Sequence, residues 1–431
     1  MCRTLFLILL CIGEISATWP RARPPNSGRA SARARALVAR GGGDVEREKP
    51  VCTTSPLSGK ILGYDPGRLH RWGFLRVWGV SVLANRFVWL QSAVVFGVAA
   101  VTGALTLCVR ESDQSLLAGF EGLEDALHGM IIFLLGLFLS EVISRWWSLI
   151  FDCVGGLADA VDGASVLAAS LLDDGAAPEE RPTAEPAKAT VARWGALSYA
   201  LVFEGARGAA ARDCVPKLSA RGLLTAGEAN ALVAASGDGE ADARVPWVWM
   251  ARMWSARLRP TADPALPLAL EQCLKGVSRV GDAKAYLDGQ LPLPYVHLLT
   301  LMAKFNMLLM ALTRGSAIAT HLRAHAAAGV ADKLIEAALD ITRLFFVPVL
   351  YQGCFDLHAM LENPLGHDII DLPERESEAA LRAECAAFIQ TRPDAAAHGD
   401  PPPGQTDNPP QGADTEASPQ MQSAAFAWAA P

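Results

Sequence analysis

Long apolar runs separated by polar segments dominate the chain. The clearest run, Phe87–Val109, contains no charged residue and is long enough to cross a bilayer as a helix. A second run covers Met130–Ile150 and follows a short acidic loop. Basic residues before the first run and acidic residues after it predict that the N-terminal side faces the cytoplasm or stroma.

Two later apolar runs are interrupted by polar residues. Leu291–Leu312 carries Lys304 and Asn306, and Leu344–Leu361 carries Asp356. Polar groups at membrane depth are costly unless they face protein or water, so these runs predict helices packed around an aqueous path. The chain is therefore predicted to be an all-α integral membrane protein with four transmembrane helices.

The remaining segments predict a water-facing part and flexible connections. Residues 191–285 have helical periodicity and predict a water-facing helical region, and residues 173–190 have the composition of an acidic linker. Residues 376–431 are rich in proline, glycine and alanine and predict a mostly disordered tail. The pattern of Glu374–Ile389 indicates one amphipathic helix before the disordered part, which begins at about Asp394.

The N-terminus has the composition of a targeting leader. Residues 1–17 indicate a secretory signal peptide, and residues 18–43 contain six arginines and no acidic residue. This arrangement resembles the two-part leader of algae with secondary plastids and favours the thylakoid or another plastid membrane. An ordinary signal peptide with a basic tail is the alternative and leaves the plasma membrane or an endomembrane open. Residues 44–64 are predicted to be a linker.

Composition narrows the class of protein. Of 431 residues, 51% are apolar and 19% charged, which fits membrane helices joined to a sizeable water-facing part. The net charge of −7 does not indicate nucleic-acid binding. The nine cysteines are scattered without a CxxC pair, so a zinc site or a disulfide framework is not expected. No recognisable catalytic motif is present, which predicts that the chain is not an enzyme.

One stripe within the second run has the spacing of a helix face. Gly129, Phe133, Leu137, Glu141 and Arg145 recur every four residues. A small residue and two apolar side chains above charges could wall a narrow hydrophobic pore. The alternative is a core-facing stripe that ends in an interfacial Arg-Trp-Trp anchor. Spacing alone favours the anchor.

Several sequence blocks, in order, resemble the bestrophin family of anion channels over residues 65–375. The blocks are Phe133-Leu-Leu-Gly136 followed by Arg145-Trp146-Trp147, Val245-Pro-Trp-Val-Trp249, Tyr351-x-Gly353 and Asn363-Pro-x-Gly366-x-Asp368-x-x-Asp371. Weaker support comes from Arg193-Trp194, from Gly222-Leu-Leu-Thr225 with Glu228, and from Leu291-Pro-Leu293 with Tyr295.

The resemblance implies a membrane-embedded homopentamer that conducts chloride, bicarbonate or both. Each subunit would supply four membrane helices and a cytosolic helical region. Gly129, Phe133 and Leu137 correspond to the family's hydrophobic neck, with Phe133 matching its aromatic residue. Leu137 replaces a second aromatic residue and Gly129 a branched aliphatic one, so gating by dewetting is in doubt. Glu141 stands where the family has an apolar residue, and pairing with Arg145 or turning from the axis would neutralise it.

The resemblance also implies a calcium clasp after the fourth run. The corresponding ligands are Asp368, Asp371 and the carbonyl groups of Met360 and Asn363, with another carbonyl expected near Tyr64. Calcium takes six to eight oxygen ligands, and His367, Ile369 and Ile370 thin the family's acidic run here. The alternative is a solvated loop in which Asp368 caps a turn.

Two other functions remain open. A membrane-embedded enzyme could use Asp356, His358 and Glu362, although Asp356 and His358 do not share a helix face. A bestrophin-like scaffold that does not conduct is the second alternative, and the departures at Gly129 and Glu141 keep it open.

Overall fold

The computed structural model describes residues 52–70, 77, 79, 81–108, 115–172, 181–237, 239–258, 265–328 and 331–390. The predicted leader, the end of the predicted tail and residues 173–180 of the predicted acidic linker lie outside these residues. The description below concerns the unit that begins at Val51.

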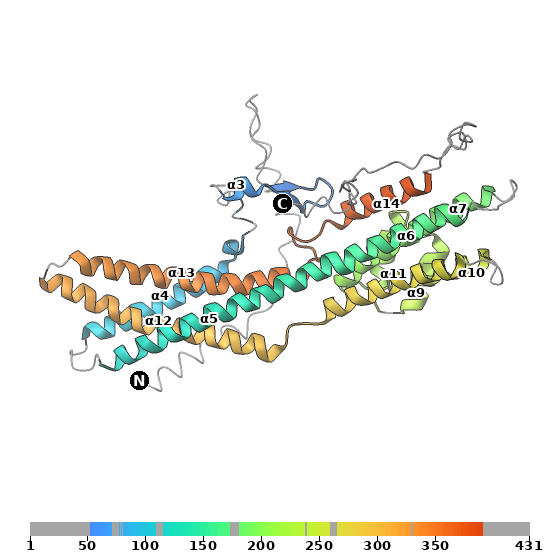
Figure 1. Ribbon diagram of the computed structural model, residues 1–431. Helices are drawn as coiled ribbons and strands as arrows, with labels where there is room; N and C mark the ends of the chain where they lie inside the picture. The colour runs from blue at the N-terminus through green and yellow to red at the C-terminus, as the bar shows by residue number, and fades with distance from the viewer. Residues whose placement is uncertain are drawn as a thin grey trace, which may run out of the picture. The chain divides into compact units, whose positions relative to one another are not determined.

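Four long helices form one packed group (Figure 1). They are α4 (Arg86–Cys108), α5 (Ser115–Trp147), α12 (Leu293–Ala328) and α13 (Ala331–Leu361), with α12 packed against the other three. Apolar side chains such as Ile131, Phe138 and Leu299 are buried between them. The four predicted runs thus coincide largely with these helices, although Leu291 and Pro292 precede α12 and the second run continues past Trp147.

Three stretches among the described residues are long and apolar enough to cross a membrane. They are Arg86–Cys108, Phe120–Leu171 and Ala265–Ala326. The fourth predicted run lies in α13, which is outside this set and carries Asp356 and His358 at its C-terminal end. The chain is therefore a mostly helical protein with three candidate membrane helices, and a fourth span stays a prediction.

Small residues let α4 and α12 approach closely. A Cβ atom on Gly315 would lie 2.3 Å from the carbonyl oxygen of Ala99, and one on Gly103 would lie 2.9 Å from the carbonyl oxygen of Gly315. Helices gain little from the hydrophobic effect against each other in lipid, so close backbone packing of this kind stabilises their association.

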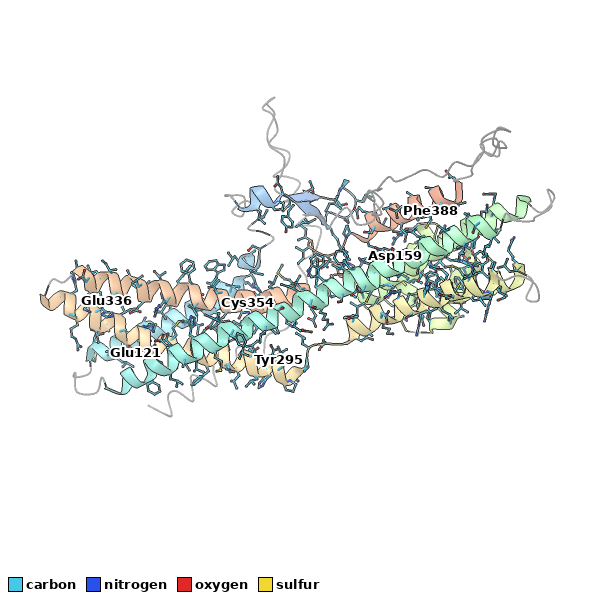
Figure 2. All side chains as sticks on the ribbon, viewed as in Figure 1. Glu121, Asp159, Tyr295, Glu336, Cys354 and Phe388 are labelled. Carbon is cyan, nitrogen blue, oxygen red and sulfur yellow. The ribbon has the colours of Figure 1, made fainter. Side chains whose placement is uncertain are left out.

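A second core lies among the other helices (Figure 2). These are α6 (Gly156–Leu171), α7 (Arg181–Ala206), α8 (Ala211–Ala220), α9 (Ala226–Ser236), α10 (Val245–Arg257), α11 (Ala265–Asp288) and α14 (Glu374–Gln390). Trp247 is fully buried there, and a Cβ atom on Gly276 would lie 2.2 Å from its ring. Its indole N–H donates to the Ser198 hydroxyl at 2.8 Å.

One uninterrupted helical stretch joins the two cores. Helix α5 continues into the π-helix η5 (Ser148–Gly155) and then into α6. The π-helical turns follow directly after Trp147, whose ring stacks on Phe151 at a centroid distance of 4.7 Å. A π-helical segment inside a longer helix is rare and marks a functional region in many proteins.

Three segments differ from the sequence-based expectation. Residues 181–190, predicted as part of a flexible acidic linker, form the start of α7. Residues 52–64, predicted as part of a linker, form an antiparallel hairpin of β1 (Cys52–Thr54) and β2 (Ile61–Tyr64). Helix α14 crosses the predicted domain boundary at residue 375, and its Leu381 and Cys385 are buried in the second core. The amphipathic helix predicted at Glu374–Ile389 is present, but it belongs to the folded part and not to the tail.

Candidate functional site

The predicted neck residues lie on an exposed face of α5. Gly129 is exposed, and the side chains of Phe133 and Leu137 are 65% and 50% exposed. The opposite face of the helix is buried, with Ile131 and Phe138 both at 0%. The stripe therefore faces away from the chain's own helices, which excludes the core-facing interpretation and leaves lipid or other copies of the chain as its surroundings.

The charged end of the stripe is arranged differently from the expected pair. Arg145 donates to the backbone carbonyl of Tyr286, and among the described residues Glu141 has no ion-pair partner. The carboxylate of Glu141 is exposed next to the stripe. Trp146 and Trp147 meet edge to face at 5.0 Å.

The three residues of the enzyme alternative do not assemble. His358 and Glu362 line a cavity of about 140 Å³ together with Arg145 and Gln290, but Asp356 is not among the lining residues. Its two carboxylate oxygens accept hydrogen bonds from Asn85 and Gln352 instead. The distances are 2.6 and 2.7 Å.

Three of the predicted clasp residues, Asn363, Asp368 and Asp371, lie in the loop between α13 and α14, and the side chains of Asn363 and Asp371 have hydrogen-bond partners within the chain. The Asn363 amide nitrogen donates to Ala206 at 2.8 Å, and its amide oxygen accepts from the Leu365 N–H at 3.1 Å. Asp371 is 2% exposed and accepts from the Asp368 N–H at 2.5 Å. Burial raises the pKa of Asp371 to about 6, although that N–H and the Lys60 charge oppose the rise.

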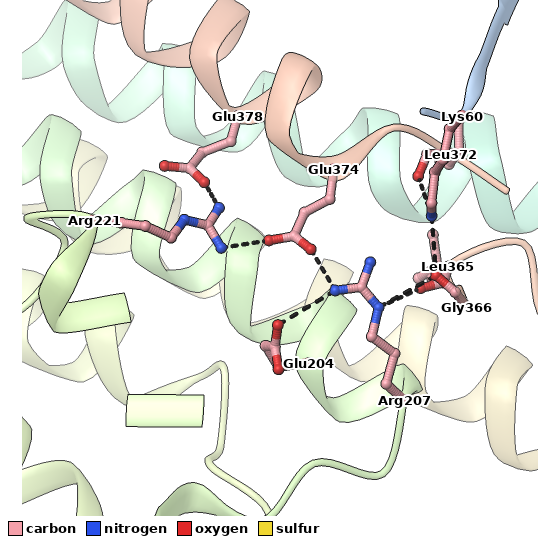
Figure 3. A network of polar contacts seen from close by, with 9 residues as sticks. All are labelled: Lys60, Glu204, Arg207, Arg221, Leu365, Gly366, Leu372, Glu374 and Glu378. Atoms are coloured by element: carbon pink, nitrogen blue, oxygen red, sulfur yellow. Dashed lines mark hydrogen bonds and ion pairs between the residues drawn. The ribbon is translucent and has the colours of Figure 1, made fainter. Parts of the chain in front are cut away.

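Two basic side chains from elsewhere in the chain enter this loop (Figure 3). The Lys60 ammonium group donates to the carbonyl oxygens of Gly366 at 3.0 Å and Leu372 at 2.9 Å. The Arg207 guanidinium group donates to the carbonyls of Leu365 and Gly366 at 3.1 and 3.3 Å. The N-terminal segment thus reaches the loop as expected, but with a cation in place of a carbonyl oxygen.

These contacts do not fit a resident calcium ion. Calcium takes six to eight oxygen ligands, but the ammonium group of Lys60 and the guanidinium group of Arg207 already occupy the Gly366 carbonyl beside the predicted ligands, and the Asn363 carbonyl accepts from the Gly366 N–H at 3.2 Å. No group of three histidine, cysteine or acidic side chains suited to a metal ion occurs among the residues that the structure describes. Asp368 is exposed, and Met360 lies on the last turn of α13.

A charge network next to the loop was missed in the sequence. The Glu374 carboxylate lies between the guanidinium groups of Arg207 and Arg221 (Figure 3), and Arg221 also pairs with Glu378. Burial opposes the ionisation of Glu374, but the two guanidinium groups hold its pKa below the ordinary value. The signal available in the sequence was the acidic first turn of α14, whose basic partners are about 150 residues away.

Two of the three weaker sequence blocks come together at the second core, whereas Leu291 and Tyr295 pack against the first. The Glu228 carboxylate accepts from both terminal nitrogens of Arg193, at 2.5 and 2.9 Å, and from the indole N–H of Trp194 at 2.7 Å. Glu228 also completes a capping box with Thr225 at the start of α9. Burial opposes ionisation, but these donors hold the pKa of Glu228 at about 2.

Solved structures share this fold. A variant of a bacterial bestrophin homologue from Klebsiella pneumoniae matches with a TM-score of 0.52 at 13% identity, covering 70% of this chain and 99% of that chain. A structure described as a membrane protein matches with a TM-score of 0.51 at 14% identity, covering 71% of this chain and 100% of that one. Identities this low show the fold alone. No curated protein matches the chain.

The sequence matches one protein family over most of the length of these helices. The family is described as "Bestrophin, RFP-TM, chloride channel", and the match covers residues 82–373, more than half of the chain. It contains the exposed stripe of α5 and the loop after α13. The chain belongs to the bestrophin family of membrane channels.

Proposed function

We propose that this chain conducts chloride, bicarbonate or both through a neck that five copies build from the stripe Gly129, Phe133 and Leu137. The observation that carries the proposal is the exposure of this stripe on a helix whose opposite face is buried. One stripe cannot surround an ion, so several copies must place their stripes around a common axis. Five copies and a fourth membrane span in α13 follow from the family resemblance.

An apolar neck would select anions by their hydration. Because no fixed cation lies on the stripe between Gly129 and Leu137, an anion must shed part of its water there. Weakly hydrated anions lose less and cross more easily. The positive edge of the Phe133 ring can face the anion. Calcium gating is left out of this proposal, because Asp371 and the Asn363 carbonyl accept backbone hydrogen bonds and Lys60 and Arg207 place positive charge at the same loop.

Ion flux from liposomes tests the proposal. The purified full chain is reconstituted, its copy number is read by native mass spectrometry, and flux is measured with chloride, bicarbonate and gluconate. We expect chloride and bicarbonate to pass and gluconate to be largely excluded. Flux no higher than in protein-free liposomes would contradict conduction and support the scaffold alternative, which the exposed Glu141 carboxylate favours.

Replacement of the neck ring tests the stripe itself. Phe133→Ala should change the chloride-to-bicarbonate permeability ratio roughly two- to tenfold, the scale of a ring-edge interaction of about 0.5–1.5 kcal/mol. The control is Phe346→Ala, which removes a ring on α13 that is 54% exposed. Equal ratios for the wild type and the Phe133 variant would remove this ring from the pore wall.

A plastid membrane, and the thylakoid in particular, is the location that we propose for the channel. The support is the composition of residues 1–43, which lie outside the described structure. Bicarbonate delivery for carbon fixation would follow from that location. A fluorescent fusion of the leader region in an algal host should reach the plastid, whereas delivery to the plasma membrane or an endomembrane would refute the plastid address.

A further inference from the structure

Lys60 is held in an unusual position for a lysine so near the start of the folded chain. It is only 8% exposed, and its ammonium group donates to the Gly366 and Leu372 carbonyls on the two sides of the loop. Lysine is rarely buried without a partner, because removing its charge from water is costly. The loop supplies the acceptors that offset this cost, and the buried Asp371 carboxylate contributes a nearby negative charge.

The hairpin that carries Lys60 is also fixed to the loop and to α14 by contacts that do not involve the lysine. The Ile61 N–H donates to the Ile369 carbonyl at 2.8 Å. The hydroxyl groups of Ser55 and Ser58 donate to the Glu376 carboxylate at the start of α14. Residues shortly before and directly after Lys60 are therefore hydrogen-bonded to the loop or to α14, and these bonds fix the position of the ammonium group.

The loop is closely packed at Gly366, where there is no room for a larger side chain. A Cβ atom on Gly366 would lie 2.9 Å from an Asp371 carboxylate oxygen and 3.2 Å from the Asn363 carbonyl oxygen. Backbone carbonyls that converge beside a buried carboxylate are what a cation requires, and here the cation is part of the chain. A divalent ion at the same place would meet the like charges of Lys60 and Arg207.

We propose that Lys60 is a tethered cation that closes the loop between α13 and α14, so that this loop needs no calcium ion. The hairpin β1–β2 then acts as a latch on residues 363–373. Removal of the ammonium group would leave the Gly366 and Leu372 carbonyls without this donor and would loosen both the loop and the hairpin.

Hydrogen exchange of the full chain in detergent tests this directly. In the wild type, exchange of peptides covering residues 363–373 should be the same in millimolar calcium and in excess chelator. Calcium-dependent protection of those peptides would overturn the proposal. The measurement reads the loop and not ion flux, so its outcome is independent of whether the chain conducts.

A matched pair of lysine variants provides a second test of the proposal by hydrogen exchange. Lys60→Met keeps the apolar stem and removes the charge, and it should raise exchange in residues 52–64 and 363–373 by roughly ten- to hundredfold, the range for hydrogen bonds to charged groups. Lys275→Met removes a lysine whose side chain is 59% exposed and should leave both segments unchanged. Unchanged exchange in the Lys60 variant would show that the ammonium group does not hold the loop.

Discussion

Glu141 lies one turn beyond Leu137 on the stripe, with its carboxylate exposed and without an ion-pair partner among the described residues. A fixed negative charge beside an anion path lowers the local anion concentration, and the effect is strongest at low salt. Glu141→Gln should therefore raise chloride flux several-fold at low ionic strength and less at high ionic strength. Asp332→Asn, which removes an exposed carboxylate at the start of α13, is the control. Equal flux in wild type and Glu141→Gln would place this carboxylate away from the path.

Glu228 gives a prediction for stability. Its carboxylate binds Arg193, Trp194 and Thr225, and its pKa of about 2 lies below the ordinary 4.5. A lowered pKa stabilises the folded state above pH 4.5, and this contribution is lost as the pH falls towards 2. Glu228→Gln should cost about 1–3 kcal/mol at neutral pH, because the charged donors lose a charged acceptor.

Thermal unfolding across pH measures the Glu228 effect. The difference between the wild type and Glu228→Gln should be greatest at neutral pH and shrink between pH 4.5 and 2. The control Glu271→Gln removes an exposed carboxylate and should cost less than about 0.5 kcal/mol. A difference that is constant across this range would mean that the Glu228 charge does not stabilise the fold.

The pair of helices α4 and α12 gives a prediction at the scale of elements. A Cβ atom on Gly315 would meet the Ala99 backbone at 2.3 Å, and backbone cannot move away as a flexible side chain can. Gly315→Ala should therefore destabilise the protein by about 1–3 kcal/mol, the usual cost of overpacking. Gly97→Ala on α4 is the control, because its added Cβ atom would meet no atom within 4 Å.

Thermal unfolding in detergent compares the two glycine variants. A new alanine in open helix surface gains up to about 1 kcal/mol in helix propensity, so Gly97→Ala should be neutral or stabilising. If Gly315→Ala were equally stable, the close approach of α4 and α12 would be wrong.

Helices were the elements most readily predicted, because their signals lie within a single segment of the sequence. Phe87–Val109 lacks charge, so its length alone indicated a helix that the structure places at Arg86–Cys108. The hairpin at residues 52–64 was missed because its strands are three and four residues long, too short for a periodic pattern. Helix α14 was recognised, but its membership of the folded part depends on contacts with α6 and α7 that are distant in sequence.

For the whole molecule, the charge network around Glu374 links distant parts of the chain. It joins α14, the turn after α7 at Arg207 and the turn after α8 at Arg221. Glu374→Gln should cost about 3 kcal/mol, near the lower end for a broken buried ion pair, because Glu204 and Glu378 still contact the two arginines. Hydrogen exchange should rise throughout α14, and the exposed Arg375→Gln serves as the control. Unchanged protection of α14 would contradict the network.

The stripe on α5 and the predicted clasp were not equally predictable from the sequence. The stripe depends on spacing within one helix, whereas the clasp depends on contacts with residues far away in the chain. The stripe of Gly129, Phe133 and Leu137 follows from helix spacing within one element, and the structure places it on one exposed face. The clasp depended on whether carbonyls and carboxylates remain free after folding. That outcome is set by Lys60 and Arg207, which are about 300 and 160 residues away from Gly366. Spacing within the loop therefore could not reveal it.

The position of Lys60 has a practical consequence for expression. The family match begins at residue 82, so a gene trimmed to the recognised domain would omit the whole hairpin. Such a shortened protein would retain the four long helices α4, α5, α12 and α13 and most of the loop, yet the Gly366 and Leu372 carbonyls would lack their ammonium partner. Any calcium response or instability measured on it would then be a product of the trimming. Affinity tags and cleavage sites are better placed ahead of Cys52, where they leave the hairpin intact.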